Sequence, residues 1–204
     1  MRRVPYPVAI ITATDPNGPP DTTSFRGMTV SSFNTVTLSP HPVISFNVRR
    51  PSETLNALLA SGRFLVHLLA PGPATSTLAR DFSKGNTTLA SMLSGHGEFE
   101  FGALSVEPEQ GSSKPLPILR RRAQSSEKEE VDFPFVFECT LHPSKIDVHD
   151  HSIILGTVVR AIEGSDTRPS GEQTGAQASL DEHSPEHLCL TYANTRFWKM
   201  GSEL

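Results

Sequence analysis

Cysteines and long apolar runs are scarce in this chain of 204 residues. Two cysteines, Cys139 and Cys189, are too few for a disulfide scaffold or a four-cysteine zinc site. No apolar run approaches the ~18 residues that a membrane-spanning helix needs. The basic N-terminal segment is not followed by the long apolar region of a signal peptide. We therefore expect an intracellular protein without a membrane partner, cytoplasmic or, as the alternative, mitochondrial.

Common catalytic signatures are absent as well. The sequence contains no GxSxG, GxGxxG or GxxxxGK[ST] motif, which argues against a hydrolase elbow, a Rossmann fingerprint and a P-loop. His149 and His151 form an H-x-H pair, but no third ligand is apparent, so we expect no metal site. The net charge of −4 argues against a nucleic-acid partner, although 120–122 is a local run of three arginines.

The pattern of elements predicts a mainly β protein. The 17 prolines and 14 glycines indicate many turns. Apolar and β-branched runs predict strands at 7–13, 26–38, 43–48, 63–70, 133–141, 152–162 and 188–192. Helical spacing of apolar residues predicts short helices at 52–60, ended by Gly62, and at 75–81. We expect a single domain over 1–204, a β-barrel or sandwich, with flexible polar insertions near 103–132 and 163–187.

The segment from Asn47 to Thr54 carries the strongest local chemistry. A strand ends there, two arginines follow, and Pro51-Ser52 opens a helix. Backbone N–H groups and the positive end of the helix dipole make such a position suitable for a phosphate. The alternative is that Ser52 only caps the helix. This segment alone leaves both readings open.

A second polar stretch runs from Gly27 to Phe33. Its hydroxyls and backbone amides could hydrogen-bond the edge of a flat heteroaromatic ring, but an ordinary half-exposed strand has the same pattern. Together the two stretches provide what a mononucleotide cofactor requires, one place for a phosphate and one for a ring.

Several motifs, in order, resemble the flavin reductase family with the FMN-binding split barrel. They are the segments 3–10, 27–33, 42–47, 51–54, 62–67, 78–82, 150–156 and 190–197. The resemblance implies an antiparallel Greek-key split β-barrel with a few short peripheral helices. It also implies a homodimer that binds FMN, with NAD(P)H as hydride donor, and a partner monooxygenase that receives the reduced flavin.

The resemblance also implies site residues at matching positions. Thr29, Val30, Ser31 and Ser32 would line the isoalloxazine ring. Asn47, Ser52 and Thr54 would hold the ribityl chain and phosphate. The remaining positions are Phe82 and Lys84 near the second helix, His151 as the catalytic residue near the flavin or nicotinamide, and Tyr192 and Arg196 closing the site. His67 is either a further site residue or a satisfied interior histidine.

Hydride transfer to a flavin needs no side-chain nucleophile, because the cofactor carries the chemistry. The empty motif search is therefore consistent with an NAD(P)H-dependent flavin reductase. One alternative is a non-enzymatic split-barrel subunit of a larger assembly that contacts protein or RNA through 120–122. Another is a flavoprotein oxidase of the pyridoxine-phosphate type.

Overall fold

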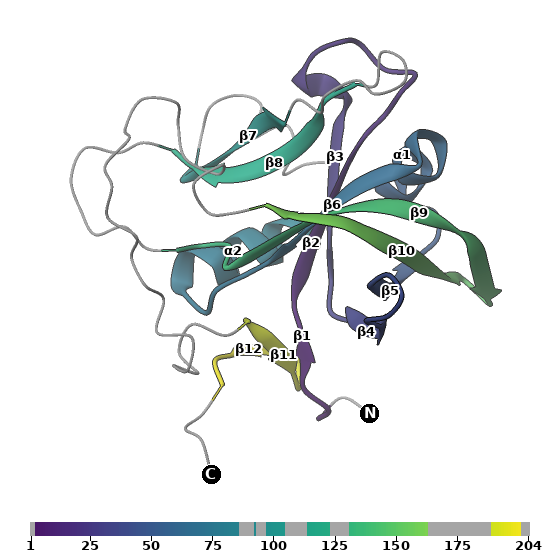
Figure 1. Cartoon of the computed structure of the whole chain (residues 1–204). Coiled ribbons are helices and arrows are strands. Elements are labelled where there is room, and N and C mark those ends of the chain that lie inside the picture. Colours follow the sequence, from purple (N-terminus) through teal and green to yellow (C-terminus); the bar gives the residue numbers. More distant parts are fainter. Residues whose placement is uncertain are drawn as a thin grey trace.

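The computed structural model describes residues 3–85, 92, 97–104, 114–122, 131–162 and 189–200. Its main body is a seven-stranded antiparallel sheet in the order β3-β2-β6-β9-β10-β5-β4 (Figure 1). These strands are β2 Ala9–Thr14, β3 Phe25–Val30, β4 Asn34–Thr37, β5 Val43–Arg49, β6 Arg63–Leu68, β9 Phe135–Val148 and β10 His151–Ile162. The mainly β prediction is confirmed.

Two smaller sheets complete the described architecture. One joins β1 Tyr6–Pro7, β11 Thr191–Ala193 and β12 Arg196–Trp198. The other pairs β7 Phe99–Leu104 with β8 Leu116–Arg121. Figure 1 shows the first of these near the two chain ends and the β7–β8 hairpin beside the opposite end of the main sheet.

The main sheet curls into a barrel because its two edge strands are consecutive in the chain. β3 and β4 lie at opposite edges of the sheet order, yet only residues 31–33 join them. So short a link requires the two edges to lie close together. We call this closure, where residues 31–33 pass from edge strand β3 to edge strand β4, the seam.

Strand β2, which lies between β3 and β6, is buried on both faces and separates two apolar cores. Ala9, Ile11 and Ala13 belong to the core that also contains Phe46 and Phe64. Ile10, on the other face, belongs to the core built with helix α2 and the β7–β8 hairpin. Burial on both faces explains why this strand is a continuous apolar run rather than an alternating one.

Both predicted helices are present. Helix α1 spans Glu53–Ser61, and the Ser52 hydroxyl caps it by accepting the Leu55 N–H at 3.2 Å. Gly62 follows with φ of 69°, which glycine adopts without a Cβ penalty. Helix α2 spans Pro73–Phe82. None of the helices in the described residues has the length and apolar character to cross a membrane.

The single strand expected over 26–38 is wrong. The structure has β3 and β4 with a break at 31–33, where the chain crosses the seam. Phe33 turns into the core, whereas the four residues of β4 are exposed. An alternating pattern of polar and apolar residues fits both β3 and β4. It carries no information about where the chain leaves one partner strand and joins another.

The expectation that 103–132 lacks order is wrong for its described part. Strand β8 lies within this range, and Leu116, Ile118 and Leu119 are buried in the core. The three arginines at the end of this strand, 120–122, are paired with acids, so they are not a solvated loop. Their shortest ion pairs are Arg120–Glu100 at 2.7 Å, Arg121–Asp132 at 2.6 Å and Arg122–Glu100 at 3.4 Å. The second predicted insertion, 163–187, lies outside the described residues.

Candidate functional site

Two cavities lie along the seam, and Asn47 lines both of them. The smaller cavity, about 510 Å³, lies between β3, the end of β5 and the start of α1. The larger cavity, about 880 Å³, lies between residues 31–35, β5 and the small sheet that contains Tyr6 and Tyr192. Both volumes fall in the range of small-molecule sites.

Polar side chains face the cavities because β5 alternates. Ile44, Phe46 and Val48 point into the barrel core. Residues on the other face include Ser45 and Asn47, which line the larger cavity. The strand therefore fixes a polar wall on one side and apolar packing on the other.

The N-terminus of α1 forms one wall of the smaller cavity. Ser52, Glu53 and Thr54 line it, and Thr54 is buried. The Ser52 hydroxyl accepts the Leu55 N–H and directs its own proton at the Met28 Sδ, 3.7 Å away. Thioether sulfur is a weak acceptor, so that proton can turn to a stronger one at little cost. The first turn of a helix also offers N–H groups that have no intrahelical partner.

Gly27 and Phe82 lie side by side in the lining of the same cavity. A Cβ on residue 27 would lie 2.4 Å from Cε1 of Phe82, so any other residue there would force the ring or β3 to move. Thr29 also lines this cavity, and its hydroxyl donates to the Ala79 carbonyl at 2.7 Å. This bond ties β3 to α2 and leaves the Thr29 oxygen as an acceptor.

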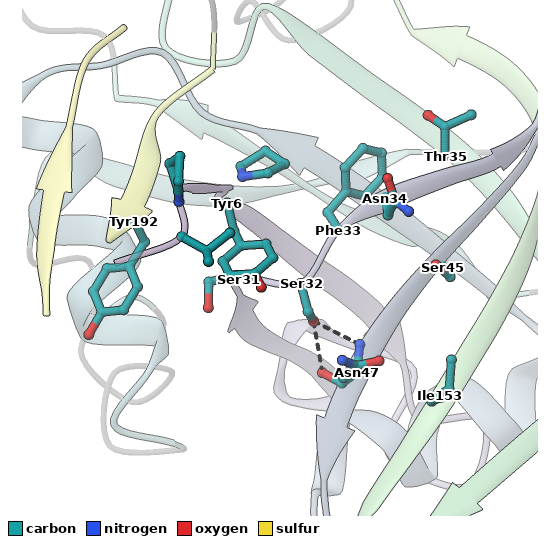
Figure 2. Close-up of a pocket in the computed structure, with 13 residues that line it drawn as sticks. Tyr6, Ser31, Ser32, Phe33, Asn34, Thr35, Ser45, Asn47, Ile153 and Tyr192 are labelled. Atoms are coloured by element: carbon teal, nitrogen blue, oxygen red, sulfur yellow. Dashed lines mark hydrogen bonds between the residues drawn. The ribbon is translucent and has the colours of Figure 1, made fainter. Parts of the chain in front are cut away.

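Ser32 crosses the seam at the larger cavity, as Figure 2 shows. Its Oγ accepts the Asn47 backbone N–H at 2.8 Å and lies 3.5 Å from the Asn47 carbonyl oxygen. Tyr6 and Tyr192 lie on the opposite side of the cavity from Ser45 and Ile153 (Figure 2). Tyr6 and Tyr192 are register partners in the β1–β11 pair, so this wall is set by strand pairing.

Three arginines near the smaller cavity are each paired with an acid. Arg26 pairs with Glu53 at 3.6 Å, Arg49 with Asp150 at 3.1 Å, and Arg50 with Asp147 at 3.9 Å. A hydrogen bond from His151, with its charge and that of Arg49, holds the pKa of Asp150 below its usual range. The charges around this cavity are therefore balanced.

Most of the sequence-predicted residues line one cavity or the other. The predicted residues that line the smaller cavity are Thr29, Val30, Asn47, Ser52, Thr54 and Phe82. Those that line the larger cavity are Ser31, Ser32, Asn47 and Tyr192. The two polar stretches singled out in the sequence, 27–33 and 47–54, thus meet at Asn47.

Three predicted residues do not line either cavity. Lys84 pairs with Asp81 at 3.1 Å, although its neighbours Ser83 and Gly85 line the smaller cavity. Arg196 is exposed on β12. His151 is the register partner of Arg49, and its Nδ1 lies 2.7 Å from the Asp150 carboxylate.

His67 is an interior residue with both ring nitrogens engaged. Nδ1 lies 3.2 Å from the Ile10 carbonyl oxygen, and Nε2 accepts the Leu119 N–H at 3.1 Å. Burial lowers its pKa to about 4, so the ring is neutral. In the described part of the chain, no group of three or more His, Cys, Asp and Glu residues could hold a metal ion.

Sequence reasoning missed several lining residues, among them Tyr6, Ser45, Ile153 and Asn56. The signal for Ser45 was present, because it lies two residues before Asn47 and shares its strand face. No local signal marks Ile153, which reaches the cavity through pairing of β10 with β5.

Two curated proteins are similar to parts of this chain in sequence. The chain is 36% identical over 84 residues to an NADH:FMN oxidoreductase of Rhodococcus erythropolis. This alignment covers 41% of this chain and 39% of that protein. It is 28% identical over 159 residues to a flavin reductase (NADH) of Kitasatospora aureofaciens, covering 78% of this chain and 66% of that protein. The alignments thus span between about two fifths and two thirds of these relatives.

Solved structures share the fold. The flavin reductase HpaC complexed with NADP+ superposes with a TM-score of 0.60 at 23% identity, covering 98% of this chain and 93% of that one. The NADH:FAD oxidoreductase SgcE6 of Streptomyces globisporus, in complex with NAD and FAD fragments, gives 0.62 at 20% identity, covering 98% and 87%. The styrene monooxygenase flavin reductase of Pseudomonas putida S12 gives 0.57 at 21% identity, covering 100% and 95%.

These matches confirm the predicted antiparallel split barrel. The family model for the flavin reductase like domain matches residues 1–199. The chain therefore belongs to the flavin reductase like family.

Proposed function

We propose that this protein is an NAD(P)H-dependent flavin reductase that transfers hydride from the nicotinamide to a flavin such as FMN. The observation that carries the proposal is the meeting of the two cavities at Asn47, one with a helix N-terminus and the other with a polar strand wall. A flavin mononucleotide has a charged tail and a flat polar ring, and the two cavities offer surroundings for each.

The smaller cavity would hold the ribityl phosphate. Its donors are the Ser52 and Thr54 hydroxyls and the N–H groups of the first turn of α1. The helix dipole adds partial positive charge at the same place. The Ser52 proton, now directed at Met28, can turn to a phosphate oxygen while Oγ keeps its capping bond to Leu55.

The larger cavity would hold the isoalloxazine ring. Ser31, Ser32 and Asn47 place hydroxyl, amide and backbone groups along one wall. Donors aimed at the ring's polar edge stabilise the negative charge that develops on reduction. Bound flavin supplies the hydride-accepting centre, and the surrounding residues orient it and limit access by water.

The other residues implied by the resemblance would act from the edges. Tyr192, from the wall set by β1 and β11, would contact the ring or the nicotinamide. Phe82 would pack beside the tail. His151 would act on the site through Asp150 and Arg49. Lys84 and Arg196, whose side chains are exposed, would contact the flavin or the nicotinamide.

The proposal includes a homodimer and a partner monooxygenase that consumes reduced flavin. The styrene monooxygenase flavin reductase and the nitrilotriacetate monooxygenase component B of Mycobacterium thermoresistibile are among the fold relatives, which supports such a partner. The relatives named NADH:FMN oxidoreductase and flavin reductase (NADH) support NADH as a donor.

The test is a flavin titration followed by turnover. Purified protein is titrated with FMN while flavin fluorescence is recorded, and NADH or NADPH is then added with FMN in excess. We expect saturable binding and protein-dependent oxidation of the nicotinamide. A protein that neither binds flavin nor accelerates its reduction contradicts the proposal.

A further inference from the structure

We propose that Glu53 is a selectivity residue, and that its carboxylate weakens binding of the FMN phosphate relative to flavins without a terminal phosphate dianion. This inference rests on the proposed function, because it assigns a role to one residue of the same site.

The position of Glu53 carries the argument. It is the first residue of α1 and lines the smaller cavity between Ser52 and Thr54. Its side chain is 60% exposed, so it lies at the mouth of the cavity. An anion bound by the first turn of α1 therefore shares that turn with a fixed negative charge.

Each of the nearby arginines described above is held by an acid and is not directed at a bound phosphate. Among the described residues that line the cavity, Arg49 and Glu53 are the charged ones, so the lining is neutral in sum. Arg49 is paired with Asp150 at 3.1 Å. Arg26, which approaches from β3, is paired with Glu53 itself at 3.6 Å and also donates to the Thr23 and Phe25 carbonyls.

These pairs leave mainly neutral donors for the phosphate, namely hydroxyls and helix N–H groups. A dianion gains less from them than from a cationic cradle, and it is repelled by Glu53. Riboflavin carries no phosphate and is insensitive to this repulsion. Removing the carboxylate charge would also release Arg26 from its partner toward the bound phosphate.

The experiment measures dissociation constants for FMN and riboflavin at low ionic strength, by quenching of flavin fluorescence. The variant is Glu53→Gln. The control is Glu98→Gln, which removes the same charge from a side chain that is 56% exposed, paired with Arg121 and outside both cavities. Glu53→Ser is a second test variant, with a residue that also suits the start of a helix.

We expect Glu53→Gln to lower the FMN dissociation constant by about three- to tenfold while riboflavin changes less than about twofold, with the difference shrinking in high salt. Glu53→Ser should shift the ratio in the same direction, and Glu98→Gln should leave it unchanged. An unchanged ratio in both Glu53 variants, or an equal shift in Glu98→Gln, overturns the proposal. If wild type and all variants bind neither flavin, the proposed function itself fails.

Discussion

The Ser32 hydroxyl holds the seam of the barrel by accepting the Asn47 N–H at 2.8 Å. Regular pairing of β4 with β5 begins two residues later, at Asn34 and Ser45. A side chain thus replaces a backbone partner where the strands diverge, and this divergence leaves room for the larger cavity. Asn47 lines both cavities, so the bond fixes the residue at which they meet.

Replacing Ser32 with alanine removes this bond. We expect a loss of roughly 0.5–1.5 kcal/mol in the free energy of unfolding and weaker FMN binding, because the Asn47 backbone is no longer held. Ser61→Ala is the matched control. The Ser61 hydroxyl likewise accepts the Arg63 backbone N–H and donates to the Arg63 carbonyl, and it lies outside both cavities. Urea unfolding and FMN titration should show a stability loss in both variants but an affinity loss in Ser32→Ala alone. Equal affinities in the two variants would contradict this role.

Ser52 can be tested for its two roles separately. Substitution by alanine removes both the cap and the donor to a phosphate, whereas glycine is a tolerable cap without a hydroxyl. We expect Ser52→Ala to cost about 1 kcal/mol of stability and Ser52→Gly only a few tenths. Both variants should weaken FMN binding by a similar factor and leave riboflavin binding nearly unchanged. If Ser52→Gly binds FMN as wild type does, the hydroxyl has no part in holding the phosphate.

Gly27 leaves the space that the Phe82 ring occupies. A Cβ at residue 27 would lie 2.4 Å from Cε1 of that ring, so Gly27→Ala forces the ring or β3 to move. We expect a loss of about 1–3 kcal/mol in stability and weaker flavin binding. The double variant with Phe82→Leu should recover part of the stability, as thermal unfolding would show. A Gly27→Ala protein as stable as wild type is the contrary result.

The stability of the fold should fall in mild acid because of His67. Its pKa is about 4 in the folded protein, against about 6.5 when exposed in the unfolded chain. The unfolded state therefore binds more protons between these values. Stability from this residue is full above about pH 6.5 and is lost as pH falls toward 4, by roughly 3 kcal/mol in all.

Urea unfolding of wild type and His67→Gln at about pH 7 and about pH 5 measures this effect. Glutamine can keep a donor and an acceptor but does not titrate, so roughly 2 kcal/mol of the pH-dependent loss should vanish in the variant. An equal loss in both proteins would assign the pH dependence to other groups.

The sequence was sufficient for elements with strong local signals. Helix α1 begins after Ser52 and ends before Gly62, as its cap residues predict. Strands β5 and β6 agree with their apolar runs to within two residues. By contrast, β8 ends in the run of three arginines at 120–122, and such a run taken by itself predicts a solvent-exposed segment. Their partners Glu98, Glu100 and Asp132 come from other segments, so no local pattern predicts the pairing.

The candidate site was also predicted only in part, because some of its residues are marked by local signals and others are not. Ser52 and Thr54 follow from a helix start, which is a local feature. Tyr6 and Ile153 reach the larger cavity through strand pairing between distant segments, which no local pattern encodes. Glu53 was visible in the motif, but its effect depends on the pairing of Arg26 and Arg49 with acids.

The central claim is that one flavin occupies both cavities and accepts hydride there. The most direct measurement mixes the protein anaerobically with FMN and NADH and follows loss of the yellow absorbance of oxidised flavin. We predict reduction that saturates with FMN concentration and slows in Ser52→Gly. Flavin reduction no faster than in the absence of protein would contradict the account.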